Sequence, residues 1–198
     1  MVQKATDTPS GRGRPPKFDH DAVVTAAIDA FWERGLEATS LTDIEAATGV
    51  DRSTLYNSFG GKSGLYELAT DQYLQQAETW LFEPLLEGDG DGLDDILRFL
   101  DRLKTGLTTA SKPGCLIVND MAIGPDKRPS ERYQAVLERG LREALGRAES
   151  VPAPLADGRA RLIASSVIGA NLISRAGRST EDLGLLIDAV IEQVESWR

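Results

Sequence analysis

The chain has 198 residues, 41% of them hydrophobic, which is enough apolar material to bury a proper core. No run approaches about 18 consecutive apolar residues, and the segment before Lys17 has no apolar stretch, which argues against a membrane span and a secretory signal. A single cysteine, Cys115, and a single histidine, His20, exclude an intrachain disulfide and an ordinary zinc site. We therefore expect a cytoplasmic protein without metal or cofactor.

The net charge of −9 argues, taken alone, against a nucleic-acid partner, because phosphate contacts require lysine and arginine. The positions of the basic residues matter more than the sum. In the N-terminal third they lie mainly in the leader, at Arg52 and at Lys62. An acidic remainder would repel DNA elsewhere on the molecule and so reduce non-specific binding.

The leader contains the segment Gly11-Arg12-Gly13-Arg14-Pro15. It resembles the core of an AT-hook, in which arginine side chains beside glycine lie in a narrow A/T minor groove. We interpret Arg12 and Arg14 as minor-groove contacts. The alternative is a basic leader that touches phosphates only loosely.

Three helices are expected next. Residues 19–34 have apolar side chains at helical spacing, Asp19 as an N-cap and Gly35 as the stop. A capping box at Ser40 begins a short second helix, and Gly49 supplies the left-handed turn after it. The third helix begins at Asp51. This spacing predicts a helix-turn-helix.

The third helix has two different faces. Val50, Leu55 and Phe59 fall on one side at 100° per residue, with Thr54 and Ser58 between them. Arg52, Ser53, Tyr56 and Asn57 fall on the other side. We interpret this outer face as the edge that reads DNA; the alternative is an exposed polar face without a partner.

The rest of the chain predicts an all-α body without strands. Helices are expected from about Gly61 to Trp80, from Leu93 past Leu100, from Ser130 to about Glu149, from Leu155 to Gly177 and from Thr180 to Arg198. A short helix is expected to open at Pro113-Gly114. The acidic loop near Asp89 lacks the first and last ligands of a calcium site, so we do not expect calcium.

The last two helices have more apolar surface than one small domain covers. We infer that they meet their copies in a two-fold homodimer, although the core of a monomer is the alternative. The expected interface residues are Leu162, Ser166, Gly169, Ala170, Ile173, Leu183, Leu186, Ile187, Val190 and Val194.

The residues Thr39-Ser40, Asp43-Ile44, Gly49-Val50, Thr54-Leu55-Tyr56, Phe59 and Lys62 resemble the DNA-binding head of TetR-type transcriptional regulators. The resemblance covers about Ala22 to Tyr66. It implies a three-helix head and a six-helix body, that is, a leader at 1–17, a DNA-binding domain at 18–64 and a ligand-binding and dimerisation domain at 65–198. It also implies repression of a palindromic operator that a small-molecule effector relieves. The implied DNA contacts are Thr39, Ser40, Arg52, Ser53, Thr54, Tyr56, Asn57 and Lys62.

The chemistry of these side chains suggests how they read double-stranded DNA. Arg52 can give a bidentate pair to guanine and Asn57 to adenine, while Tyr56 and Lys62 suit phosphate. Asn57 and Ser58 depart from the residues that many relatives carry, so the sequence does not predict which bases are preferred.

The effector site is expected in an apolar space between the body helices. Candidate wall residues, which core packing explains equally well, are Trp80, Phe82, Phe99, Leu103, Leu107, Cys115, Met121, Tyr133, Leu137 and Asn171. Cys115 also suggests an alternative, a thiol-based redox or electrophile sensor. Its position in the first turn of a helix favours thiolate, although most buried cysteines are inert.

Other classes of function fit the sequence less well. Gly60-Gly61-Lys62-Ser63 lacks the leading glycine and the strand of a phosphate loop, and His20 has no triad partners in view, so we do not expect an enzyme. A helical adaptor that binds only proteins is a remote alternative. It would leave Arg52, Tyr56 and Asn57 without a role.

Overall fold

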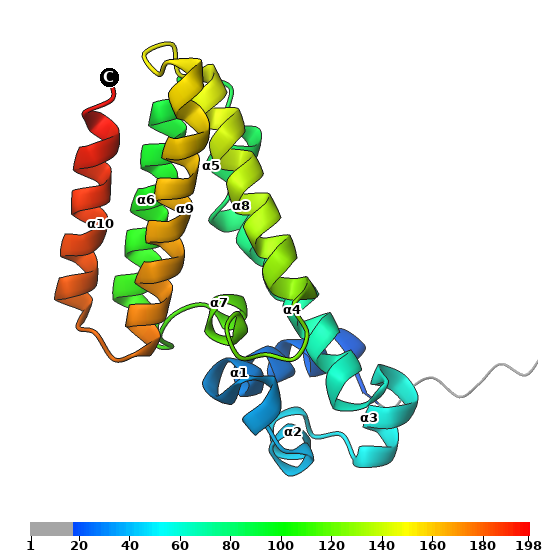
Figure 1. Cartoon of the computed structure of the whole chain (residues 1–198). Helices are drawn as coiled ribbons and strands as arrows, with labels where there is room; N and C mark the ends of the chain where they lie inside the picture. The colour runs from blue at the N-terminus through cyan, green and yellow to red at the C-terminus, as the bar shows by residue number, and fades with distance from the viewer. Residues whose placement is uncertain (1–17) are drawn as a thin grey trace, which may run out of the picture.

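The computed structural model describes residues 18–198, and within that range every regular element is an α-helix. Figure 1 shows a small N-terminal group of helices below a taller bundle. The elements are α1 (His20–Ala38), α2 (Leu41–Thr48), α3 (Arg52–Phe59), α4 (Gly61–Trp80), α5 (Glu83–Glu87), α6 (Gly92–Thr109), α7 (Leu116–Asp120), α8 (Arg128–Arg147), α9 (Ala153–Arg175) and α10 (Thr180–Glu195).

Local signals at the N-terminal helices set their boundaries. The Asp19 side chain accepts hydrogen bonds from backbone N–H groups of the first turn of α1. Ser40 and Asp43 form a complete capping box at the start of α2, and Asp51 caps α3. Gly49 has a φ of 72°, in the left-handed region that glycine adopts without strain. The expected helix-turn-helix is confirmed.

Two hydrophobic cores lie along the chain. The first fills the space between α1, α2, α3 and the start of α4, and Phe31, Ile44, Leu55 and Leu65 are fully or almost fully buried in it. The second fills the bundle of α4 to α10. Leu116 of α7 packs in the first core, so the short helix α7 belongs to the contact between the two.

The long helix α4 joins the two groups and runs from Gly61 to Trp80, as the apolar spacing predicted. Two five-residue helices, α5 and α7, stand beside the longer helices of the bundle. The sequence did not predict α5. The proposed division at residue 64 stays a prediction, because α4 is continuous through that point.

None of the described helices combines the length and the apolar character that crossing a bilayer requires.

Candidate functional site

The helix α3 is amphipathic in the way the sequence predicted. Leu55 and Phe59 are buried against the first core, and Val50, just before the helix, is buried with them. Thr54 is half-buried, and Ser58 is exposed. Three apolar anchors therefore hold the helix on the surface of the head, so that its opposite face meets solvent.

The exposed face of α3 carries Arg52, Ser53, Tyr56 and Asn57. The Tyr56 side chain is 60% exposed and lies against Gly61. The Asn57 amide donates to Ser53 Oγ over 3.3 Å. Because this bond joins two exposed side chains, either group can exchange it for a base edge at little cost.

Arg52 is engaged with α2 within the head. Its Nε lies 3.3 Å from Glu45 Oε2, and its Nη2 lies 3.4 Å from Thr42 Oγ1. The arginine side chain is 58% exposed, so water screens the ion pair. The pair therefore orients the guanidinium but leaves it able to exchange partners.

Two of the expected DNA contacts have structural roles instead. Thr39 is fully buried, and its hydroxyl donates to the Gly35 carbonyl over 2.6 Å. Lys62 Nζ donates to the carbonyls of Leu36, Glu37 and Thr39 at 2.9, 3.3 and 3.1 Å. Lys62 therefore satisfies the free carbonyls at the end of α1, and a phosphate would have to displace those bonds.

Ser40 is exposed at the start of α2, unlike the buried Thr39 before it. Its hydroxyl donates to Asp43 Oδ2 over 2.6 Å. This bond and the backbone N–H of Ser40 hold the pKa of the Asp43 carboxyl below its usual value, and Arg34 contributes a smaller effect. The capping box therefore keeps a carboxylate at this N-terminus.

Within residues 18–64, each lysine and arginine already has a partner in the protein. Arg34 pairs with Asp43, Arg52 pairs with Glu45, and Lys62 binds carbonyl groups. The described part of the head is thus poor in free positive charge. The remaining basic residues of the N-terminal third, Arg12 and Arg14 among them, lie outside the described residues.

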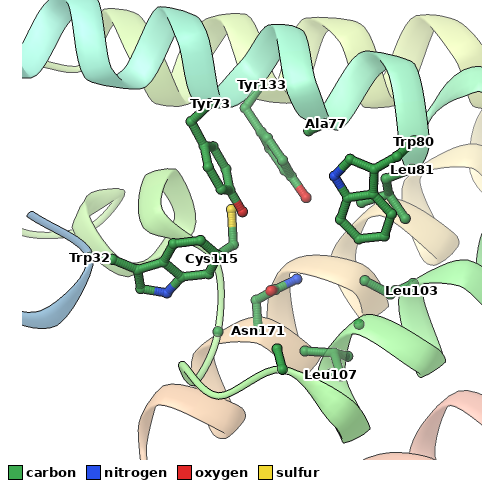
Figure 2. Close-up of a pocket in the computed structure, with 13 residues that line it drawn as sticks. Trp32, Tyr73, Ala77, Trp80, Leu81, Leu103, Leu107, Cys115, Tyr133 and Asn171 are labelled. Carbon is green, nitrogen blue, oxygen red and sulfur yellow. The ribbon is translucent and has the colours of Figure 1, made fainter. Parts of the chain in front are cut away.

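A cavity of about 480 Å³, counting its open mouth, lies between the head and the bundle. Figure 2 shows the hydroxyls of Tyr73 and Tyr133 pointing into it from one side and the Asn171 amide from the other. Trp32 of α1 and Trp80 of α4 stand at opposite ends. The lining is Trp32, Tyr73, Ala77, Trp80, Leu81, Leu103, Gly106, Leu107, Ala110, Gly114, Cys115, Tyr133 and Asn171.

The structure separates the expected wall residues into two groups. Those that line the cavity are Trp80, Leu103, Leu107, Cys115, Tyr133 and Asn171. Those that do not are Phe82, Phe99, Met121 and Leu137. Phe82 and Phe99 stack at 5.7 Å between ring centroids in the bundle core, where both are fully buried. Trp32 of α1 and Tyr73 of α4 were missed; for Trp32 the reason is that nothing in the sequence indicated that α1 reaches the body.

The surroundings of the Cys115 thiol do not favour the thiolate form that the alternative of a thiol-based sensor requires. Cys115 precedes α7 as its N-cap and is buried. Burial raises the pKa of the thiol, and hydrogen bonds with Tyr73 and with the backbone of Val118 and Ile117 offset only part of that effect. The thiol therefore stays neutral at physiological pH, which weakens the case for a redox or electrophile sensor.

The segment that carries Cys115 also holds the head. Trp32 Nε1 donates to the Pro113 carbonyl over 3.1 Å. At the other end of the segment, the buried Asp120 carboxylate accepts from the Leu36 N–H over 3.0 Å and from the Tyr66 hydroxyl over 2.9 Å. One wall of the cavity is therefore tied to α1 at two points.

The surface of α9 and α10 is the other expected site. Leu162 is 52% exposed, and Ser166, Leu186 and Val190 are half-buried; we call these four residues the α9–α10 face. A shallow groove runs between them, with Ala189 and Gln193 along its side. An apolar groove of this kind is typical of an interface.

Four expected interface residues lie inside the chain instead. Ala170, Leu183, Ile187 and Val194 are almost completely buried in the core of the bundle. They pack α9 and α10 against the rest of the body and have no surface left for a second copy. Gly169 and Ile173 are half-buried and stay at the edge of the α9–α10 face.

Residues 23–69 match the family model described as "Bacterial regulatory proteins, tetR family". The chain is 30% identical over 187 residues to the HTH-type transcriptional repressor ComR of Escherichia coli K12, a match that covers 87% of each protein. It is 31% identical over 62 residues to the repressor BdcR of the same organism, which is 31% of this chain and 32% of BdcR.

Solved structures have the same fold. A cysteine-substituted variant of the TetR family regulator CifR, complexed with 26-bp double-strand operator DNA, superimposes with a TM-score of 0.75 at 24% identity, over 91% of this chain and 98% of that one. A TetR regulator from Chloroflexus aurantiacus gives 0.72 at 24% identity, over 88% and 93%.

Proposed function

The chain belongs to the TetR family of bacterial regulatory proteins and is a DNA-binding transcriptional regulator, and from that premise we propose that it represses a palindromic operator until a small molecule releases it. The observation that carries the proposal is the exposed polar face of α3, held outward by Leu55 and Phe59. A helix-turn-helix inserts such a face into the major groove. We place the protein in the cytoplasm, on DNA, with no catalytic activity.

The proposed direct contacts are a subset of the expected ones. Arg52 and Asn57 would read base edges, and Ser53, Thr54 and Tyr56 would position the helix on the backbone. Ser40 would add a contact at the start of α2. Arg12 and Arg14 of the leader supply charge that the described head does not offer.

Two copies are needed to read a palindrome. A dimer formed through the α9–α10 face would present two recognition helices to successive major grooves, roughly 34 to 36 Å apart. The exposure of Leu162 and the groove beside Leu186 and Val190 support this arrangement. An isologous contact buries the same face on both copies.

Effector release would use the cavity between head and body. Its walls include Trp32 of α1, and its Cys115-bearing segment binds the head through Pro113 and Asp120. A molecule that moves this segment therefore moves α1. Such coupling is a shift between two arrangements, typically worth about 1 to 3 kcal/mol.

A gel shift with the DNA upstream of the protein's own coding region tests the function. The proposal expects a retarded band that competitor DNA of unrelated sequence does not remove. If the purified protein retards the upstream fragment and random DNA equally at every salt concentration, sequence-specific regulation is wrong.

A further inference from the structure

We propose that the cavity between head and body takes an uncharged, mainly aromatic molecule. One polar group of this molecule forms hydrogen bonds with both the Tyr133 hydroxyl and the Asn171 side-chain amide. This inference rests on the proposed effector-controlled function and specifies its ligand class. Three features of the described residues carry it: the absence of charge in the wall, the faces of the aromatic side chains, and two polar atoms without partners.

The first feature is the charge of the wall. None of the cavity-lining residues is an aspartate, glutamate, lysine, arginine or histidine. Transfer of a carboxylate or an ammonium group from water into such a space is costly unless an opposite charge receives it. The wall therefore favours a neutral ligand over an ion of either sign.

The second feature is the shape and chemistry of the wall. Trp32, Tyr73, Trp80 and Tyr133 surround the space, and Leu103 and Leu107 close its floor (Figure 2). Aromatic rings bind other flat rings by offset stacking or edge contacts. Because the volume of about 480 Å³ includes the open mouth, a fused two-ring compound would place one ring between the aromatic side chains and the other ring in the mouth.

The third feature is a pair of polar atoms. The Tyr133 side chain is 1% exposed, and within residues 18–198 its hydroxyl has no hydrogen-bond partner. The side-chain N–H of Asn171 donates a hydrogen bond to the Val167 carbonyl over 2.9 Å. The Oδ1 atom of Asn171 is therefore left to accept a hydrogen bond from another group. Figure 2 shows both groups directed into the cavity from opposite walls.

Among the described residues, neither atom belongs to the fully enclosed polar atoms that lack a partner, so both meet the open space of the cavity and are free to pair with a ligand. A ligand hydroxyl has the chemistry that both atoms require, because it accepts a hydrogen bond from Tyr133 and donates one to Asn171 Oδ1. A phenolic or similar hydroxyl on an aromatic frame is therefore the simplest complement to the wall.

Three compounds of nearly equal size and different charge test the proposal: 2-naphthol, 2-naphthoate and 2-naphthylmethylammonium. Calorimetric titration of the full chain at neutral pH measures binding of each, without DNA. We expect 2-naphthol to bind at least about tenfold more tightly than either ion. Tight binding of the anion or the cation, or no binding of any of the three at millimolar concentration, overturns the proposal.

A matched pair of variants tests the hydroxyl contact. Tyr133→Phe keeps the ring and removes the unpaired hydroxyl, and we expect it to weaken binding of 2-naphthol about fivefold to tenfold. Ser150→Ala also removes one hydroxyl, at an exposed position outside the cavity, and leaves binding unchanged. Equal binding by the wild type and Tyr133→Phe contradicts the contact.

A gel shift of the same preparations separates this proposal from the proposed function. Loss of all DNA binding with intact binding of 2-naphthol contradicts the regulator and leaves the ligand class standing. Specific DNA binding without a preference for the neutral compound supports the regulator and contradicts the proposed ligand class.

Discussion

The carboxylate of Asp120 accepts a hydrogen bond from the backbone N–H of Leu36 over 3.0 Å, which fastens the short helix α7 to the end of α1. Both residues are buried, and the Tyr66 hydroxyl approaches the same carboxylate oxygen at 2.9 Å. Gly35 lies so close that a Cβ atom there would meet Asp120 at 2.4 Å. This contact connects the DNA-binding head to the segment that lines the cavity.

Replacement of Asp120 by alanine tests this connection. The variant leaves the Leu36 N–H and the Tyr66 hydroxyl buried without an acceptor, so we expect the free energy of unfolding to fall by about 1 to 3 kcal/mol. Tyr66→Phe is the control that removes one of the two bonds, and it costs less. Urea denaturation measures both; equal stability of Asp120→Ala and wild type contradicts the role of the carboxylate.

Lys62→Met distinguishes a structural lysine from a phosphate contact. Methionine has an unbranched side chain of similar length, but it leaves three carbonyls at the end of α1 without a donor. We therefore expect the free energy of unfolding to fall by about 1 to 2 kcal/mol. The salt dependence of operator binding should stay the same. A slope shallower by about one instead would indicate a lost phosphate contact.

The N-terminal leader should strengthen operator binding. Deletion of residues 1–17 removes Lys4, Arg12, Arg14 and Lys17, and we expect weaker binding with a flatter dependence on salt. Affinity that is unchanged at two salt concentrations contradicts this expectation.

Two double variants of equal charge separate the two interpretations of the leader. Arg12→Ala with Arg14→Ala removes the residues expected in the minor groove, and Lys4→Ala with Lys17→Ala removes charge outside the glycine-flanked segment. Minor-groove reading predicts a larger loss for the arginine pair on A/T-rich flanks. Loose phosphate contact predicts equal losses.

The α9–α10 face should hold two copies together. Leu162→Asp places a charge in an exposed apolar position on this face, and we expect sedimentation of a monomer where the wild type gives a dimer. Ile123→Asp is the control, since Ile123 is 78% exposed in a turn outside the face and should not change the assembly. A dimer that survives Leu162→Asp indicates another interface.

Much of the fold could be predicted from local signals. The capping box at Ser40, the cap at Asp51 and the glycines after the short helices define the helix-turn-helix, because each acts within one turn of the chain. The faces of α3 follow from periodicity alone. Leu55 and Phe59, four residues apart, lie on the same side of the helix, and that side is buried.

The roles of single side chains depended on contacts that the sequence pattern does not encode. Lys62 binds carbonyls about 25 residues earlier in the chain, and Trp32 of the head lines a cavity of the body. Periodicity also identified one broad apolar stripe on α10 without telling which part of the stripe meets the chain itself. Ile187 therefore turned out to be core, whereas Leu186 remains on the surface.

The most direct test of the central claim is selection of bound sequences from a random DNA pool, with wild type and Asn57→Ala in parallel. The wild type should enrich a palindrome with half-sites about 10 to 10.5 base pairs apart. Asn57→Ala should relax one position and lose about 1 to 3 kcal/mol there, while Gln76→Ala on the exposed surface of α4 should select the wild-type sequence. A pool that shows no enrichment, or identical selection by Asn57→Ala, would contradict the assignment of α3 as the reading helix.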